Sequence, residues 1–175
     1  MNRARTKGGI DVAEIEVKGL SDLAKALKEL PAEIASRNGG PLARSLAKAA
    51  RVFRNRAQQL APSAPGPYMV GGVLLEPGRL KESIRAVRAR KPDATEQYVV
   101  KPFSKQIRKK YGFGVNYWHL VEFGFTHESG KTIGPRSFLS AAYESEKTNA
   151  LDVFKKSLGE GIERARKKIY KKKNG

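Results

Sequence analysis

The sequence has no cysteine and, in 175 residues, only two histidines and one tryptophan. The absence of cysteine excludes disulfide bonds, thiol nucleophiles and every thiolate-bound zinc or iron–sulfur site. So few histidines also make nucleophilic catalysis, which commonly needs a histidine base, a poor expectation. We therefore expect a fold held together by packing, without catalytic residues, metal or cofactor.

Acidic residues are scarce beside basic ones. Seventeen Asp and Glu stand against 35 Lys and Arg, which gives a formal net charge of +18. Self-repulsion on this scale is commonly relieved by an anionic partner. Nucleic acid, an acidic protein surface and anionic lipid are the three partner classes that this charge favours.

Long apolar runs are also missing. No uncharged run approaches the roughly 18–20 residues that cross a bilayer, and the mean hydropathy is −0.54. We expect a soluble protein without a membrane partner, although an amphipathic helix on anionic lipid stays an alternative. The basic start "MNRARTKGG" leads into no apolar stretch, so it predicts a disordered arm over residues 1–9 rather than a secretory signal.

The length favours one folded domain. We place it at residues 10–166, with a flexible Pro- and Gly-rich loop at about 61–78 and a basic tail at 167–175. Alternation predicts a short strand at 10–17, and apolar spacing predicts a helix from about 20 to 34. A second helix is predicted from Pro41 to about Leu60, and a last helix begins near Phe138.

Three further runs alternate apolar and polar residues, at 83–90, 97–102 and Val115–Phe123. Strands that follow one another closely in sequence form antiparallel meanders. The expected fold class is α+β. A small antiparallel sheet of three to four strands packs with two N-terminal helices and one long C-terminal helix.

The segment "YWHLVEFGFTHESG", residues 117–130, collects His119, Glu122, His127 and Glu128. These residue types bind metals or move protons, but the spacing of a zinc-binding helix is absent. In a strand, His119 and Glu122 would point to opposite faces. We therefore predict a strand and its exit turn, whose aromatic and aliphatic residues anchor the sheet. His119, Glu122 and the loop at 125–131 would be available to a neighbouring subunit.

Two groups of cations are candidates for contact with DNA or with a partner protein, because phosphates are bound by Lys and Arg on exposed faces. One group lies in the second predicted helix, where no acid occurs between Pro41 and Leu75, and the other lies in a basic segment that we expect to be a loop. The two groups are Arg44, Lys48 and Arg51, and Lys105, Arg108, Lys109 and Lys110.

Three segments taken in order resemble the small tail-component or neck proteins of long-tailed, lambdoid-type bacteriophages. They are "APSAP" at 61–65 followed by "GRLKESI" at 78–84, "YWHLVEFGF" at 117–125, and "GPRSFLSAAYE" at 134–144. The resemblance spans roughly Leu20 to Arg166. The loop before Gly78 is longer than is usual in that family, and Phe125 replaces a common Thr. The motif residues are Gly78, Arg79, Leu80, Ser83, Ile84, Tyr117, Trp118, Val121, Glu122, Phe123, Gly124, Pro135, Phe138 and Leu139.

Local roles can be assigned to several of these residues. Gly78 can supply a turn, Leu80 and Ile84 can anchor, and Arg79 with Lys81 would stay free for an acidic neighbour. Pro135 would end the loop before the last helix. Phe138 and Leu139 would pin that helix to the core.

The resemblance implies a structural virion protein of the head–tail junction, acting in neck formation, tail completion or tail termination. It implies a ring of identical subunits, contacts with neck and tail-tube proteins, assembly in the bacterial cytoplasm, and no catalysis. Cations facing the lumen of such a ring would suit non-specific contact with passing DNA. A free nucleic-acid-binding protein is the alternative, and a metal-dependent nuclease is a more distant one.

Overall fold

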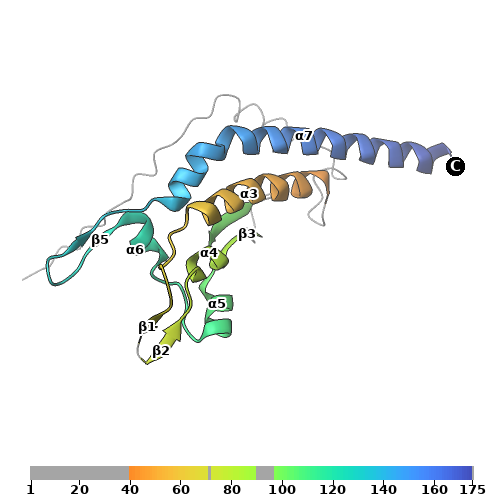
Figure 1. The fold of residues 1–175 in the computed structure, drawn as a ribbon. Helices are drawn as coiled ribbons and strands as arrows, with labels where there is room; N and C mark the ends of the chain where they lie inside the picture. The colour runs from red at the N-terminus through yellow and green to blue at the C-terminus, as the bar shows by residue number, and fades with distance from the viewer. Residues whose placement is uncertain (1–39, 71, 90–96, 175) are drawn as a thin grey trace, which may run out of the picture. The chain divides into compact units, whose positions relative to one another are not determined.

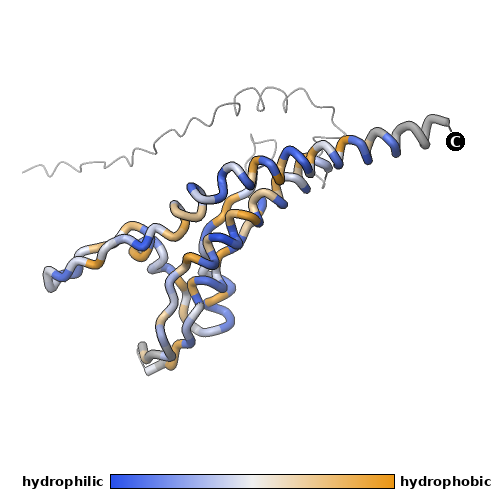
Figure 2. The backbone as a smooth tube through the Cα atoms, turned by 45° about the horizontal axis from the view of Figure 1, so that its top comes forward, coloured by the Kyte–Doolittle hydropathy of each residue, from blue (hydrophilic) through white to orange (hydrophobic). Residues whose placement is uncertain are grey.

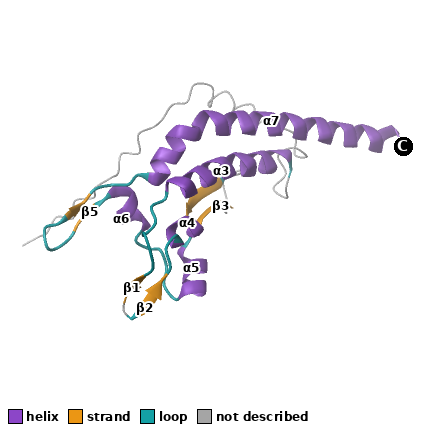
Figure 3. Ribbon diagram, in the orientation of Figure 1, coloured by secondary structure: helices purple, strands orange, loops and turns teal. Residues whose placement is uncertain are grey.

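The computed structural model describes residues 40–70, 72–89 and 97–174. The arm at 1–9, the strand at 10–17 and the helix at 20–34 lie outside the described residues. Figure 1 shows the described elements as a ribbon, and Figure 3 separates helix from strand. In chain order they are α3 (Pro41–Leu60), β1 (Tyr68–Val70), β2 (Val73–Leu75), α4 (Arg79–Ser83), β3 (Ile84–Arg88), β4 (Tyr98–Pro102), α5 (Ser104–Tyr111), α6 (Trp118–Phe123), β5 (Phe125–Thr126), β6 (Thr132–Ile133) and α7 (Phe138–Asn174).

Helix α3 has the bounds that its sequence predicts. Pro41 lies in the first turn, where the missing N–H of proline would have had no partner anyway. The helix ends at Leu60 because Ala61 precedes Pro62, and a residue before proline is driven out of the helical region. Ala61 accordingly has φ −61° and ψ 125°. The buried side chains of the helix are Leu42, Ala43, Ser45, Ala50 and Ala57.

Helix α7 lies antiparallel along α3 (Figure 1). The rings of Phe53 and Tyr143 stack with their centroids 5.5 Å apart, while the start of α3 approaches a later turn of α7. A Cβ added to Gly161 would lie 2.8 Å from the Cβ of Pro41. Glycine at this position therefore allows the two helices to come close.

The predicted long C-terminal helix is present, and apolar and polar turns alternate along it (Figure 2). Its buried apolar residues are separated by four or eight residues, so each lies near the side of the one before it while the stripe winds slowly around the helix. They are Phe138, Ala142, Ala150, Phe154 and Leu158. The helix continues to Asn174, so it also includes most of the segment where a basic tail is expected. No helix within the described residues is long and apolar enough to cross a membrane.

The main core cluster joins the end of α3, the short helix α4, strand β3, and the first turns of α7. Ile84 and Phe138 are fully buried there, and Ile107 of α5 and Val115 reach it from the other side. The complete cluster is Ala57, Ala61, Leu80, Ile84, Ile107, Val115, Phe138 and Ala142. Helices and strands distant in sequence thus share one apolar centre.

Strands β3 and β4 form the antiparallel pair that the sequence predicts, with Ile84 opposite Pro102 and Arg88 opposite Tyr98. The fold class is α+β, but the sheet has fewer strands than predicted. The described strands form three separate antiparallel pairs, β1 with β2, β3 with β4, and β5 with β6. The basic segment expected as a loop contains helix α5, and the loop at 61–78 contains the β1–β2 hairpin.

The predicted third strand at Val115–Phe123 is wrong, because Trp118–Phe123 is helix α6. Aromatic and β-branched residues favour a strand only through their surroundings. Here the surroundings favour a helix, since its carbonyl groups find partners in the chain ahead of α7. The N–H of Arg136 donates to the carbonyl of Val121 at 2.8 Å, and the N–H of Ser137 donates to that of Glu122 at 3.1 Å.

Candidate functional site

Helix α6 directs some side chains of the "YWHLVEFG" segment into the core and others into solvent. Trp118 and Val121 pack against the main core, and Glu122 is only 2% exposed. His119 is exposed, with its ring edge-on to Trp118 at 6.1 Å between centroids. Phe123 is 65% exposed. Phe123 is therefore not an anchor, and Glu122 is not open to a neighbouring subunit.

The carboxylate of Glu122 caps the first turn of α7. One oxygen accepts the N–H of Leu139 at 2.9 Å. The other accepts the N–H of Ser140 at 2.9 Å and its hydroxyl at 2.7 Å. The first N–H groups of a helix have no partner within it, and the helix dipole favours a negative charge there. Glu122 supplies both the acceptors and the charge.

This geometry makes Glu122 a structural residue rather than a proton-transfer group. Both of its oxygens are used, and His119 lies on the exposed side of α6. His127 is occupied locally, because its Nδ1 accepts the N–H of Ser129 at 3.1 Å. In the part of the chain that the structure describes, no three His, Cys, Asp or Glu side chains form a group that could hold a metal ion.

Gly124 ends α6 at a point where only glycine fits. Its φ is +74°, a region that side chains rarely adopt. A Cβ there would lie 2.7 Å from the carbonyl oxygen of Ile133 and 2.9 Å from the nitrogen of Pro135. The backbone before α7 therefore crosses directly over Gly124, which brings the end of α6 close to the start of α7.

The "GRLKESI" segment forms a turn, a short helix and the start of β3. Gly78 has a φ of +80°, and Leu80 and Ile84 are 3% and 0% exposed. The hydroxyl of Ser83 donates to the carbonyl of Leu80 at 2.6 Å. The amide of Gln58 donates to the carbonyl of Ile84 at 3.0 Å, which ties α3 to β3.

Arg79 is not free for an acidic neighbour, which corrects the expectation from the sequence. It is 2% exposed, its guanidinium donates to the carbonyl of Phe113, and it lies 5.4 Å from the centre of the Tyr111 ring. Within the described residues its Nε has no hydrogen-bond partner. The polar contact and the aromatic ring hold the turn before α4 against the end of α5.

The cations proposed for DNA or partner contact lie on two helices. Arg44, Lys48 and Arg51 are all exposed on α3, three or four residues apart, and so share one side of the helix. Lys105, Arg108 and Lys109 are exposed on α5. Among the described residues, no acid forms an ion pair with any of these six.

Lys110 differs from the other candidate cations because it is already paired. Its Nζ lies 2.8 Å from an oxygen of Glu82, and the hydroxyl of Tyr111 donates to the second oxygen at 2.8 Å. The hydrogen bonds from Lys110 and Tyr111 lower the pKa of Glu82 below its ordinary 4.5. In turn, the hydrogen bond to Glu82 raises the pKa of Lys110 above its ordinary value.

Four exposed apolar side chains of the described residues are absent from the predicted site residues, and one of them is Phe113, which is 38% exposed. Met69 is 62% and Leu74 is 59% exposed, and they face each other across the β1–β2 hairpin. Ile133 is 44% exposed. The sequence held a signal for this hairpin, since "YMV" and "VLL" are separated by two glycines, which is typical of a tight β-turn.

The sequence profile of one protein family, described as "Bacteriophage HK97-gp10, putative tail-component", matches residues 21–124. The chain belongs to this family. The matched residues include "GRLKESI" and "YWHLVEFG", so the phage tail resemblance is confirmed, while "GPRSFLSAAYE" lies beyond the match. Among curated proteins and among solved structures, no significant match to the chain is found.

Removal of the Glu122 carboxylate should destabilise the fold. We expect Glu122→Ala to lower the free energy of unfolding by about 2–3 kcal/mol, the usual worth of hydrogen bonds to a charged group. Glu128→Ala removes the same side chain from an exposed position and should change the free energy of unfolding by less than about 0.5 kcal/mol. Urea denaturation of both variants measures the difference. Equal losses would show that Glu122 does not cap α7.

Substitution of Gly124 separates backbone strain from steric clash. Gly130 also has a positive φ, +81°, but open space around its missing Cβ. We expect Gly130→Ala to cost about 1 kcal/mol through the backbone alone. Gly124→Ala should cost at least about 1 kcal/mol more, since the chain before α7 must move. Similar unfolding midpoints in denaturant for both variants would argue against the close crossing.

The ion pair of Glu82 predicts a dependence of stability on pH. Because the folded chain lowers the pKa of Glu82, the charged carboxylate stabilises the fold above the ordinary pKa, and this contribution is lost as the pH falls through the folded pKa. The difference in unfolding free energy between wild type and Glu82→Gln should therefore shrink from about pH 6 to about pH 3. The change will be small, since Glu82 is 40% exposed and solvent screens the pair. If the difference in unfolding free energy stayed constant over this pH range, the ion pair of Glu82 would not be its cause.

Proposed function

We propose that this member of the phage tail-component family is a structural subunit of the head–tail junction. Copies of the chain would form a ring that contacts neck and tail-tube proteins, in neck formation, tail completion or tail termination. The role requires no catalysis and no cofactor. The family supports a place in the tail, and the surface of the chain supports assembly.

The observation that carries the proposal is the exposure of large apolar side chains on a highly charged chain. Met69 and Leu74 project from one hairpin, and Phe123 and Ile133 lie at or beside another. Exposed apolar groups that gather on projecting elements are typical of protein–protein contact. They give a ring subunit surfaces to bury against its neighbours.

The exposed cations fit a second surface of such a ring. Arg44, Lys48 and Arg51 form an unpaired row on α3 among the described residues, and Lys105, Arg108 and Lys109 add a further group on α5. A lumen that passes DNA would repel the phosphates if acids lined it, whereas cations would lower that repulsion. We assign one or both groups to passing DNA or to an acidic partner.

The position in the virion can be tested directly by electron microscopy. Gold-labelled antibodies against the chain should mark phage particles at one point, between head and tail. Tails purified without heads, and heads without tails, serve as matched specimens that show to which part the label belongs. Label along the whole tail tube, or no label on complete particles, would overturn the junction role.

A free nucleic-acid-binding role is the second candidate, favoured by the net charge of +18. It predicts that the isolated full chain binds duplex DNA with a micromolar or tighter Kd. It also predicts that Arg44→Glu, Lys48→Glu and Arg51→Glu together reduce the salt slope by about 0.9 for each phosphate that the chain no longer neutralises. A triple change to Glu at Lys131, Lys155 and Lys156 alters the net charge equally. Weak DNA binding, with the same salt slope in both triple variants, would exclude the free nucleic-acid-binding role.

A further inference from the structure

Strand β3 pairs with β4 along one edge, and its register shows what lies on the other edge. The N–H of Phe103 donates to the carbonyl of Ser83, and the N–H of Ala89 donates to that of Gln97. Backbone groups alternate between the two edges of a strand. With Ile84 opposite Pro102 and Ala86 opposite Val100, both Ile84 and Ala86 direct their backbone groups away from β4.

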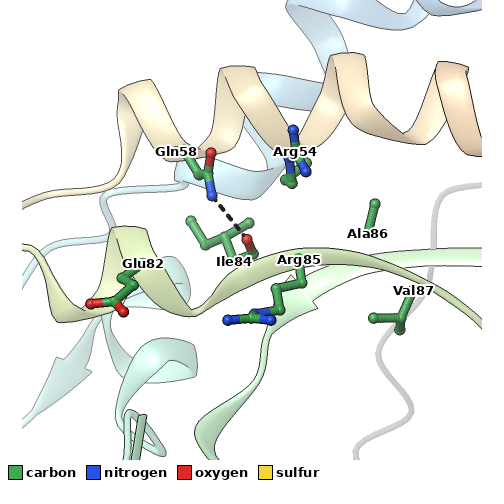
Figure 4. Close-up of a pocket in the computed structure, with 7 residues that line it drawn as sticks. All are labelled: Arg54, Gln58, Glu82, Ile84, Arg85, Ala86 and Val87. Carbon is green, nitrogen blue, oxygen red and sulfur yellow. Dashed lines mark hydrogen bonds between the residues drawn. The ribbon is translucent and has the colours of Figure 1, made fainter. Parts of the chain in front are cut away.

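The outer edge of β3 borders a groove beside α3. The groove has a volume of about 330 Å³ and is lined by Arg54, Gln58, Glu82, Ile84, Arg85, Ala86 and Val87. Figure 4 shows Ala86 on the α3 side of β3, and Arg85 and Val87 on the opposite side. Gln58 occupies the carbonyl of Ile84, and the N–H of Ile84 donates to the carbonyl of Lys81. Among the described residues, no strand pairs with Ala86 on this edge, and its small side chain adds little bulk there.

The charges of the groove favour an acidic occupant. Arg85 forms no ion pair with any described residue, and Arg54 binds only the neutral amide of Asn55. Glu82 is the one acid in the lining, and Lys110 and Tyr111 already bind its two oxygens. An arriving carboxylate would therefore meet two arginines that form no ion pair among the described residues.

We propose that the outer edge of β3 binds an extended, acidic segment of another protein chain, which adds to the β3–β4 pair as a third strand. The backbone of the segment pairs with Ala86, and its acidic side chains contact Arg54 and Arg85. Two-stranded sheets are marginal on their own, and addition of a strand to an open edge is a common mode of peptide recognition. The inference does not depend on the ring or on the head–tail position.

A protein strand fits this groove better than a nucleic acid does. The groove offers the backbone donor and acceptor of Ala86, and Val87 supplies apolar contact. Binding of single-stranded nucleic acid commonly uses aromatic side chains on which bases stack, and none of the seven lining residues is aromatic. The two occupants can be separated by experiment.

The test uses the full chain and fluorescein-labelled peptides of eight residues. One peptide alternates pairs of glutamates with pairs of valines, so that glutamates lie on both faces of an added strand. The other has lysine in place of glutamate, and an octamer of thymidylate is the third probe. Arg85→Glu reverses one groove charge, and Lys156→Glu makes the same charge change at an exposed position of α7. Ala86→Pro removes one N–H donor, and proline is tolerated on an edge strand when that N–H is not used in the sheet.

We expect the glutamate peptide alone to bind, and its Kd to rise about tenfold with Arg85→Glu and about fivefold with Ala86→Pro. Lys156→Glu should change the Kd by less than about twofold. Binding should also slow hydrogen exchange at the Ala86 amide. Absence of binding, equal binding of the lysine peptide or the oligonucleotide, or an unchanged Kd in Arg85→Glu would overturn the proposal. The exposed Arg85 variant keeps the test decisive if Ala86→Pro does not fold.

Discussion

The contact between the Glu122 carboxylate and the first turn of α7 determines how the rest of the described fold is arranged. No acid lies in the first turn of α7 itself, so its N–H groups take their acceptors from α6. The buried apolar residues of α7 are separated by four or eight residues. A shift of the helix start by one residue would rotate that stripe by about 100°. By fixing the start, Glu122 fixes the face that α7 presents to α3.

The elements with strong local signals can be predicted well from the sequence. Helix α3 has a proline at its start, a proline after its end and an apolar stripe between them, and the β3–β4 pair follows from alternation. Helix α6 cannot be found in this way. Its six residues are too few to nucleate a helix alone, and it is held by hydrogen bonds from Arg136 and Ser137, which are distant in sequence.

The site illustrates the same limit for side chains. The spacing within "YWHLVEFG" is enough to argue against a metal-binding pattern, but the role of Glu122 depends on Leu139 and Ser140, about seventeen residues later. One signal is present in the sequence. A long helix that begins without an acid in its first turn needs an acceptor from elsewhere. The preceding "VEFG" segment contains a nearby acid of this kind.

The segments that carry the family resemblance mainly hold the fold, and this limits what family membership says about partners. Leu80, Ile84, Glu122 and Phe138 are all buried, and Gly124 allows a close crossing of the backbone. None of these five can be the surface that a partner recognises. Partner contact must therefore use other, exposed residues, and the proposed surfaces are the β1–β2 hairpin, the row of cations on α3, the outer edge of β3 and the exposed motif residue Phe123. Two proteins could share this frame and still differ at these surfaces, so partner choice can change without disturbing the cap that orders α7.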